Sequence, residues 1–321
     1  MKSISARNVG GEASRDSCGV AIIGCLKTMA STQQLIVGSV YTSTVLLATP
    51  VYLRILYLFV SKSTYRKLPC YQIMTQMGLS QCIMAIGYFT FGMAQLLDKD
   101  YFGIANIFTR ACFAGTTTEA FLGFVLVLNR LVIMCSVPAP NLVFKILQLL
   151  GALLYITYIT IYSTPLATVI ITPGVYIMRM NITPITLVWL SVSGAILQST
   201  LFATFVLYAV LIAHIIYTRY SKGGLTNLRK EMNIFFYAGL RFTCDITLTL
   251  LFHYGKLPDH PLSGFFQLWA YMLNNLVVSA MLHLLVNRKL RRMFFRFLPV
   301  NTTLVRPITT SRTAASKSSQ Q

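Results

Sequence analysis

"EAFLGFVLVLNRLVIMC" (residues 119–135) is apolar enough to lie in hydrocarbon, yet it begins with Glu119 and carries Asn129 and Arg130 near its far end. A helix crosses a bilayer with about 20 mainly apolar residues. A charged side chain at that depth is costly, so it faces the interior of a bundle, finds a partner or stays protonated. The stretch therefore predicts a membrane span in which Glu119 and Arg130 are candidate functional residues.

The composition agrees with a membrane protein. The chain is 55% hydrophobic and only 11% charged, against roughly 25% charged residues in soluble domains. Its net charge of +19 comes from short basic clusters between apolar runs, without the interleaved aromatic residues typical of single-strand binding. The pattern therefore favours cytoplasmic loops facing anionic membrane lipid, and no nucleic-acid partner is predicted.

Seven apolar runs are long enough to span a membrane, which predicts an all-α, seven-transmembrane bundle. They cover residues 35–60, 70–97, 107–134, 143–169, 184–217, 233–253 and 261–286. The basic residues gather in alternate loops, at 62–67, 219–230 and 288–296. By the positive-inside rule these loops are cytoplasmic and the N-terminus lies outside. The sequon at Asn181 then falls in an outer loop, as glycosylation requires.

The domain organisation follows from these runs. Residues 1–34 are expected to form an extracellular segment of low order, within which a signal sequence is an open alternative. Residues 35–286 are the bundle. The stretch 287–298, "NRKLRRMFFRFL", alternates apolar and basic residues at helical intervals and predicts an amphipathic helix on the cytoplasmic face. The Ser/Thr-rich tail 299–321 is expected to be disordered.

Three stretches carry a resemblance to a known family. "CYQIMTQMGLSQCI" (70–83), "LVLNRLV" (126–132) and "LLVNRKLRR" (284–292) resemble the second span, the third span and the exit of the seventh span in nematode serpentine chemoreceptors, most like class T or class X. These are G-protein-coupled receptors with the rhodopsin-like fold. The resemblance covers residues 35–298, and the order and spacing of the motifs carry it.

The resemblance implies a function. It implies a chemosensory receptor in the plasma membrane of a sensory neuron, which binds a small apolar or volatile ligand inside the bundle and activates a heterotrimeric G protein. The chain departs from the wider superfamily in having Gln81 in place of an aspartate, Ala105 near the place of a cysteine, and residues 279–283 in place of Asn-Pro-x-x-Tyr.

The resemblance also assigns the cytoplasmic residues that would contact the G protein. Arg130, at the inner end of the third span, matches the receptor arginine that engages the G protein when the bundle opens. The alternative is an anchor that reaches the lipid interface. The residues assigned to coupling are Asn129, Arg130, Arg229, Lys230 and Arg288.

Glu119 lies eleven residues before Arg130, or roughly 16 Å along a helix, close to the middle of the membrane. Three alternatives stay open for it. The resemblance matches Gln81, Glu119, Asn275 and Ser279 to positions that gather around a sodium ion, so they form a candidate ion or proton site. Glu119 could instead be protonated and hydrogen-bonded across helices. It could also pair with Arg241, which lies four residues before Asp245 on one helix face, as an interhelical lock.

The resemblance places the ligand pocket in the outer half of the bundle. The facing residues would be Cys112, Phe113, Thr116, Phe265 and Trp269, an apolar and aromatic set. The dispersed histidines and the lack of an HExxH motif or catalytic arrangement argue against an enzyme, and no cofactor or metal is expected. The alternative function is a seven-span ligand-gated channel or transporter, although the spans show no ring of charges or inverted repeat.

Overall fold

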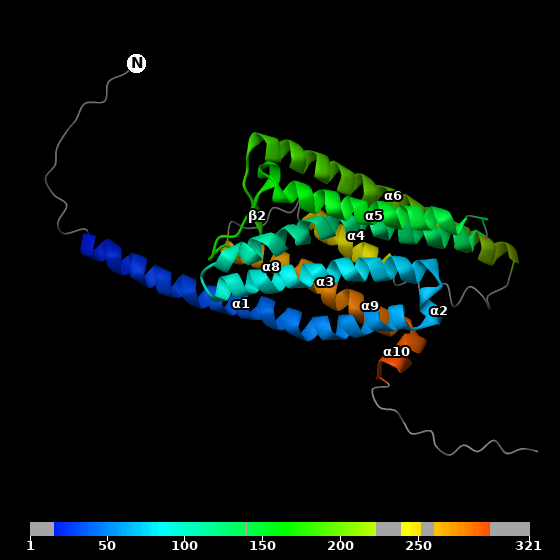
Figure 1. Ribbon diagram of the computed structural model, residues 1–321, viewed down its shortest axis with the longest axis horizontal. Coiled ribbons are helices and arrows are strands. Elements are labelled where there is room, and N and C mark those ends of the chain that lie inside the picture. The colour runs from blue at the N-terminus through cyan, green and yellow to red at the C-terminus, as the bar shows by residue number, and fades with distance from the viewer. Residues whose placement is uncertain (1–15, 136, 139, 223–238, 252–259, 296–321) are drawn as a thin grey trace, which may run out of the picture.

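The computed structural model describes residues 16–135, 137–138, 140–222, 239–251 and 260–295. Figure 1 shows long helices lying side by side in a bundle. The elements are α1 (Asp16–Ser61), α2 (Ser63–Arg66), α3 (Pro69–Leu96), η1 (Tyr101–Gly103), α4 (Ile104–Met134), α5 (Asn141–Ser163), η2 (Pro165–Ala167), β1 (Val169–Ile170), β2 (Arg179–Met180), α6 (Pro184–Lys222), α8 (Pro261–Met272), η3 (Leu273–Val278), α9 (Ser279–Val286) and α10 (Arg288–Phe295).

Six of the predicted spans correspond to helices that are long and apolar enough to cross a membrane. Among the described residues these are Thr32–Ser61, Pro69–Leu96, Tyr101–Met134, Asn141–Ser163, Pro184–Tyr217 and Leu262–Leu285. The sixth predicted span, 233–253, contains a described helical segment, 239–251. The rest of that span lies outside the described residues, as do the expected tail 299–321 and residues 296–298 of the amphipathic helix.

The two largest differences between predicted and observed boundaries lie at the start of α1 and at the end of α5. Helix α1 begins at Asp16, so part of the N-terminal segment expected to have low order is helical. Helix α5 ends at Ser163 rather than continuing to residue 169, and Thr164 is extended with ψ 164°. Pro165 explains this end, because proline disfavours the helical conformation in the residue before it. Strands β1 and β2 then form an antiparallel hairpin, with Val169 opposite Met180.

Glycines allow helix α3 to approach its neighbours closely. A Cβ atom on Gly38 of α1 would lie 2.9 Å from the carbonyl oxygen of Gly92. A Cβ atom on Gly87 of α3 would lie 2.6 Å from the Phe108 carbonyl oxygen of α4. Small residues at such crossings let membrane helices pack backbone to backbone. Helices α1, α3 and α4 therefore form a tight layer, and it positions the central side chains described below.

The two ends of the bundle are built differently (Figure 1). At one end lie α2 and α10, next to the basic residues that predict the cytoplasmic side. Leu290 and Phe294 of α10 are buried in the main hydrophobic cluster, while Arg291 and Arg292 are exposed. Asn287 starts α10, since its Oδ1 accepts a hydrogen bond from the Leu290 N–H at 3.0 Å. An amphipathic helix thus follows the seventh span.

The opposite, predicted outer end carries the β1–β2 hairpin. Gln95 of α3 holds the hairpin loop, accepting from the Gly174 N–H at 3.0 Å and donating to the Val175 carbonyl at 3.1 Å. The Tyr41 hydroxyl of α1 donates to the carbonyls of Tyr176 and Phe265, both at 3.2 Å. We call this set, with Gln34, the hairpin network. It joins the loop to α1, α3 and α8 through neutral groups.

Candidate functional site

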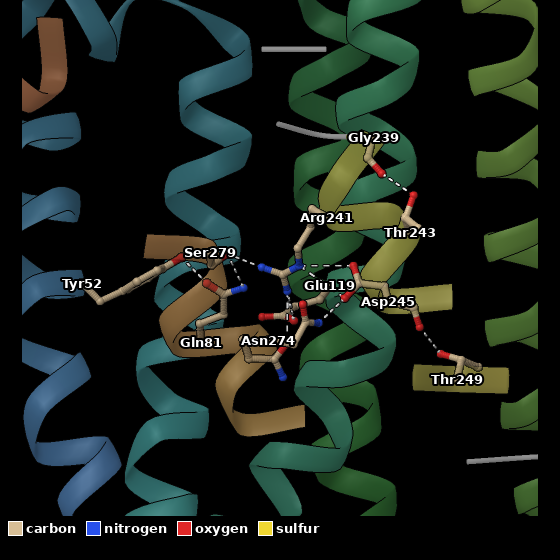
Figure 2. Close-up of polar contacts among 11 residues, drawn as sticks. Tyr52, Gln81, Glu119, Gly239, Arg241, Thr243, Asp245, Thr249, Asn274 and Ser279 are labelled. Atoms are coloured by element: carbon tan, nitrogen blue, oxygen red, sulfur yellow. Dashed lines mark hydrogen bonds and ion pairs between the residues drawn. The ribbon is translucent and has the colours of Figure 1, made fainter. Parts of the chain in front are cut away.

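The guanidinium group of Arg241 lies at the centre of a buried polar cluster (Figure 2). Its Nη2 is 3.2 Å from Glu119 Oε2 and 3.1 Å from Asn275 Oδ1. Its Nε is 3.2 Å from Asp245 Oδ2, one helical turn further along the same segment. Its Nη1 donates to the Ser279 hydroxyl. One side chain therefore connects α4, segment 239–251, η3 and α9.

Further side chains extend the cluster to α1 and α3. The Asn274 amide donates to Asp245 Oδ1 at 2.5 Å. The Gln81 amide of α3 lies 3.5 Å from the Ser279 hydroxyl, and the Tyr52 hydroxyl of α1 donates to Gln81 Oε1. We call these eight residues the central network: Tyr52, Gln81, Glu119, Arg241, Asp245, Asn274, Asn275 and Ser279. The structure brings together all four residues of the expected polar core and both residues of the expected lock.

Asn274 and Tyr52 were not singled out by the sequence, and a π-helical turn explains why Asn274 was missed. Residues Leu273–Val278 form this turn in the middle of the seventh span. A π turn holds more residues than an α turn and occurs often at functional sites. Because the turn is wider, the successive side chains of Asn274 and Asn275 both reach the network. The adjacent asparagines in an apolar span were the available signal, whereas nothing in the sequence marks Tyr52.

The position of Arg241 bears on the expectation of a sodium site. A sodium ion among Gln81, Glu119, Asn275 and Ser279 would need their oxygens as ligands. In the structure Glu119 Oε2, Asn275 Oδ1 and Ser279 Oγ face the N–H groups of Arg241 instead. Arg241 is therefore the cation that three of the four expected sodium ligands face in this structure.

The network contains two carboxylates and one guanidinium, so it carries an excess negative charge when all three are ionised. Glu119 is 7% exposed and Arg241 is 4% exposed. Glu119 Oε1 is buried and has no hydrogen-bond partner within the described part of the chain. The Asp245 side chain is 34% accessible. An unpaired carboxylate oxygen in an apolar interior is costly, so this atom is the natural place for a further proton or donor.

Two cavities of about 30 Å³ each lie on either side of the network. The outer cavity, toward the hairpin, is lined by Thr116, Glu119, Leu197, Asp245, Thr249 and Tyr271. The inner cavity, toward the predicted cytoplasmic end, is lined by Met77, Glu119, Leu126, Tyr208, Arg241 and Phe242. Each has room for a water molecule, which needs about 10–15 Å³. The ion pairs thus separate two small spaces.

Phe265 and Trp269 of the expected ligand pocket pack against α1. Phe265 and Trp269 stack on each other with their ring centroids 5.9 Å apart, and Phe265 packs edge-on against Tyr41 of α1. The Trp269 indole N–H points to Thr44 of α1 at 3.5 Å. Both rings therefore pack on α1 and do not line the outer cavity.

Two of the three pocket residues on α4, Cys112 and Phe113, belong to the same hydrophobic cluster as Phe265 and Trp269. Cys112 is buried, with its Sγ 3.4 Å from the Met84 carbonyl. Phe113 packs on Tyr162, 5.7 Å between ring centroids. Only Thr116 of the expected set borders the outer cavity, whose lining combines the carboxylates Glu119 and Asp245 with the aliphatic residues Ala120, Leu197 and Leu201. The outer cavity is therefore a different place from the apolar and aromatic pocket expected from the sequence, and that pocket stays a prediction.

The residues assigned to G-protein coupling lie at the predicted cytoplasmic end. Asn129 and Arg130 are buried in the last turns of α4, at 2% and 3% exposure. Arg288 is exposed at the start of α10. Arg229 and Lys230 lie outside the described residues. At the other end of the bundle Asn181 is exposed directly after β2, as a glycan would require.

Comparison with known proteins identifies the fold. No protein-family model and no curated protein sequence matches the chain. Among solved structures the chain is similar to squid rhodopsin, with a TM-score of 0.65 at 10% sequence identity over 82% of this chain and 84% of that one. The chain has the seven-helix fold of rhodopsin. At this identity the likeness concerns the fold, and it agrees with a multi-pass membrane protein.

Proposed function

We propose that the protein is a chemosensory G-protein-coupled receptor. The observation that carries the proposal is the rhodopsin fold over 82% of the chain, combined with an arginine, Arg130, buried at the predicted cytoplasmic end of α4. In this proposal a small molecule binds within the bundle, and the inner ends of the helices then move apart to bind a heterotrimeric G protein. The resemblance to serpentine chemoreceptors supports the sensory role and the plasma membrane of a sensory neuron.

Asn129, Arg130, Arg229, Lys230 and Arg288 are the proposed contacts for the G protein. The two α4 residues are buried in this conformation, so they reach a partner only after the bundle opens. The exposed Arg288 is available in both states. Activation is therefore proposed to expose Asn129 and Arg130.

The central network is the proposed lock on that opening. Arg241 ties segment 239–251 to Glu119 of α4 and to the seventh span. Such a group has two discrete arrangements, joined or separated, and a ligand that favours the separated one shifts the population. Exchanging the charges, Glu119→Arg with Arg241→Glu, should restore expression and coupling that either single change removes. A double variant as impaired as the singles would contradict the lock.

The experiment that tests the receptor function uses the full-length chain in cell membranes. We would measure recruitment of a panel of Gα subunits by energy transfer, for the wild type and for Arg130→Ala. The matched control is Arg110→Ala, which removes an arginine from the opposite end of the same helix. Recruitment that Arg130→Ala reduces and Arg110→Ala leaves intact supports the proposal. A ligand-gated current without Gα recruitment would favour a channel instead.

A further inference from the structure

The outer cavity has an electrostatic character that defines what it can bind. Two carboxylates, Glu119 and Asp245, share the one guanidinium of Arg241. When both carboxylates are ionised, the network therefore holds one negative charge more than it neutralises. Burying an uncompensated charge in a membrane protein is costly, so a positive group bound beside Glu119 would be stabilised by the excess negative charge.

The hydrogen-bonding groups of the cavity point to the same ligand. The Thr116 hydroxyl donates its single hydrogen to the Cys112 carbonyl at 3.0 Å, and the Thr249 hydroxyl donates to the Asp245 carbonyl at 2.8 Å. A hydroxyl has one hydrogen and two lone pairs, so both offer only lone pairs to the cavity. Glu119 Oε1, 93% buried by residue and without a donor, is a third acceptor. Tyr271 and Asn275 also line the cavity, and the Tyr271 hydroxyl hydrogen-bonds with Thr249, which leaves Thr249 Oγ1 one lone pair. Three acceptor oxygens, on Glu119, Thr116 and Thr249, thus border the cavity (Figure 2 shows Glu119 and Thr249).

We propose that the outer cavity binds the protonated amino group of a small primary amine, with Glu119 Oε1, Thr116 Oγ1 and Thr249 Oγ1 accepting its three N–H bonds. An ammonium group has three donors and no acceptor, which matches these three atoms. It is close to a water molecule in size, so it fits a space of about 30 Å³. Leu197 and Leu201 of α6 border the same cavity and would contact a short hydrocarbon chain.

This assignment rests on the proposed receptor function, because the amine would be the class of ligand that the receptor binds inside its helix bundle. It also gives the lock a trigger. A cation at Glu119 competes with Arg241 for the same carboxylate, and like charges in an apolar interior repel. Binding of the amine therefore weakens the contact between α4 and segment 239–251, and the sixth span becomes free to move away from the third.

The test uses the purified full-length protein in lipid nanodiscs and two small probes of equal shape, ethylamine and ethanol. A ligand that binds only the folded state raises the melting temperature in proportion to the logarithm of its concentration over Kd. We expect the amine to raise Tm in a saturable way, and the alcohol and an equal concentration of sodium chloride to leave it unchanged. Equal shifts from amine and alcohol, or from amine and sodium, would overturn the proposal.

Substitutions test whether the amine binds at Glu119. Glu119→Gln leaves the neutral Arg241–Asp245 pair and should fold, while the affinity for the amine falls about tenfold or more. Asp98→Asn is the matched control, since it removes a carboxylate that accepts from Gln34 at the hairpin end, away from the cavity. Unchanged amine affinity in Glu119→Gln would contradict the site.

Two variants keep the test decisive if Glu119→Gln does not fold. Thr116→Val is nearly isosteric and removes one acceptor, and Leu197→Phe fills the cavity. Both should weaken the Tm shift, and an undiminished shift in both would overturn the proposal.

The melting assay contains no G protein, so it tests the amine site separately from the receptor function. If the amine does not bind but the protein still recruits Gα, only the ligand class is rejected. Binding without any recruitment rejects the receptor function and leaves the site standing.

Discussion

The central network and the hairpin network both join helices through buried polar groups, but they differ in charge. In the centre, three ionisable side chains face one another across α4 and segment 239–251. Under the hairpin, Tyr41 and Gln95 bind backbone groups of the loop and of α8. The nearby Asp98 carboxylate, which accepts from Gln34, is exposed. The first network depends on a balance of charge, and the second only on complete hydrogen bonding.

This difference predicts how each network fails. Removing one partner of a buried ion pair leaves an uncompensated charge and is strongly destabilising, whereas removing a neutral partner costs the desolvation of the group left behind. A neutral network therefore suits a fixed cap over the outer end of the bundle. A charged network is suited to switching, because a single added charge or proton changes its balance.

The largest effect is expected from Arg241→Gln. This change leaves Glu119 and Asp245 facing each other without a cation, and we expect a loss of about 3–5 kcal/mol in the free energy of unfolding. Thermal unfolding in nanodiscs measures it, with Arg179→Gln on the exposed strand β2 as the control. A variant as stable as the wild type would show that the central network does not depend on charge balance.

A double variant sharpens the comparison. Glu119→Gln combined with Arg241→Gln removes one carboxylate together with the guanidinium, so less negative charge stays unpaired than in Arg241→Gln alone. We expect the combined loss to be smaller than the sum of the two single losses by about 0.5–3 kcal/mol. The same unfolding measurement on the four proteins of the cycle gives this coupling energy. Strict additivity would mean that the two side chains do not interact.

A smaller effect is expected at the hairpin from Gln95→Ala. The Gly174 N–H and the Val175 carbonyl would lose their partner, which costs about 1–3 kcal/mol. Because the change is local, hydrogen exchange of the Gly174 amide should accelerate more than exchange in α4. Gln33→Ala, on the exposed side of α1, should leave both unchanged. Equal acceleration throughout the bundle would indicate that the cap is not a separate unit.

The smallest effect is expected from Tyr41→Phe. The ring stays packed between Phe91 and Phe265, and only the hydroxyl shared by two carbonyls is lost. We expect a loss of about 0.5–1.5 kcal/mol, measured by thermal unfolding beside Tyr57→Phe, whose ring is 60% exposed. A loss as large as that of Arg241→Gln would remove the distinction between the two networks.

The sequence was informative wherever one chemical property decides the outcome. Length and apolarity predict spans, so six runs correspond to described helices. The cost of charge in hydrocarbon marked Glu119, Arg241 and Asp245, and the four-residue spacing put the last two on one face. The end of α5 was misjudged by six residues, because hydropathy does not report the restriction that Pro165 imposes on Thr164.

The directions of side chains were not available from the sequence. Phe265 and Trp269 were expected to face α4, but the rotation of α8 turns both toward α1. Asn274 and Tyr52 join the network only because a π turn and the approach of α1 to α3 bring them there. Each of these facts depends on how one helix is rotated against another, which periodicity within a helix does not specify.

The sequence by itself determined a seven-span membrane bundle, its predicted orientation, and the presence of costly charges near its centre, because hydrophobicity and charge are properties of single residues in a known solvent. Only the tertiary structure decided which oxygens Arg241 binds, and hence that a guanidinium takes the place expected for a sodium ion. It also decided that Glu119 keeps one oxygen unpaired. Partners are set by distances of a few ångströms between helices that are far apart in the chain, and packing alone fixes those distances.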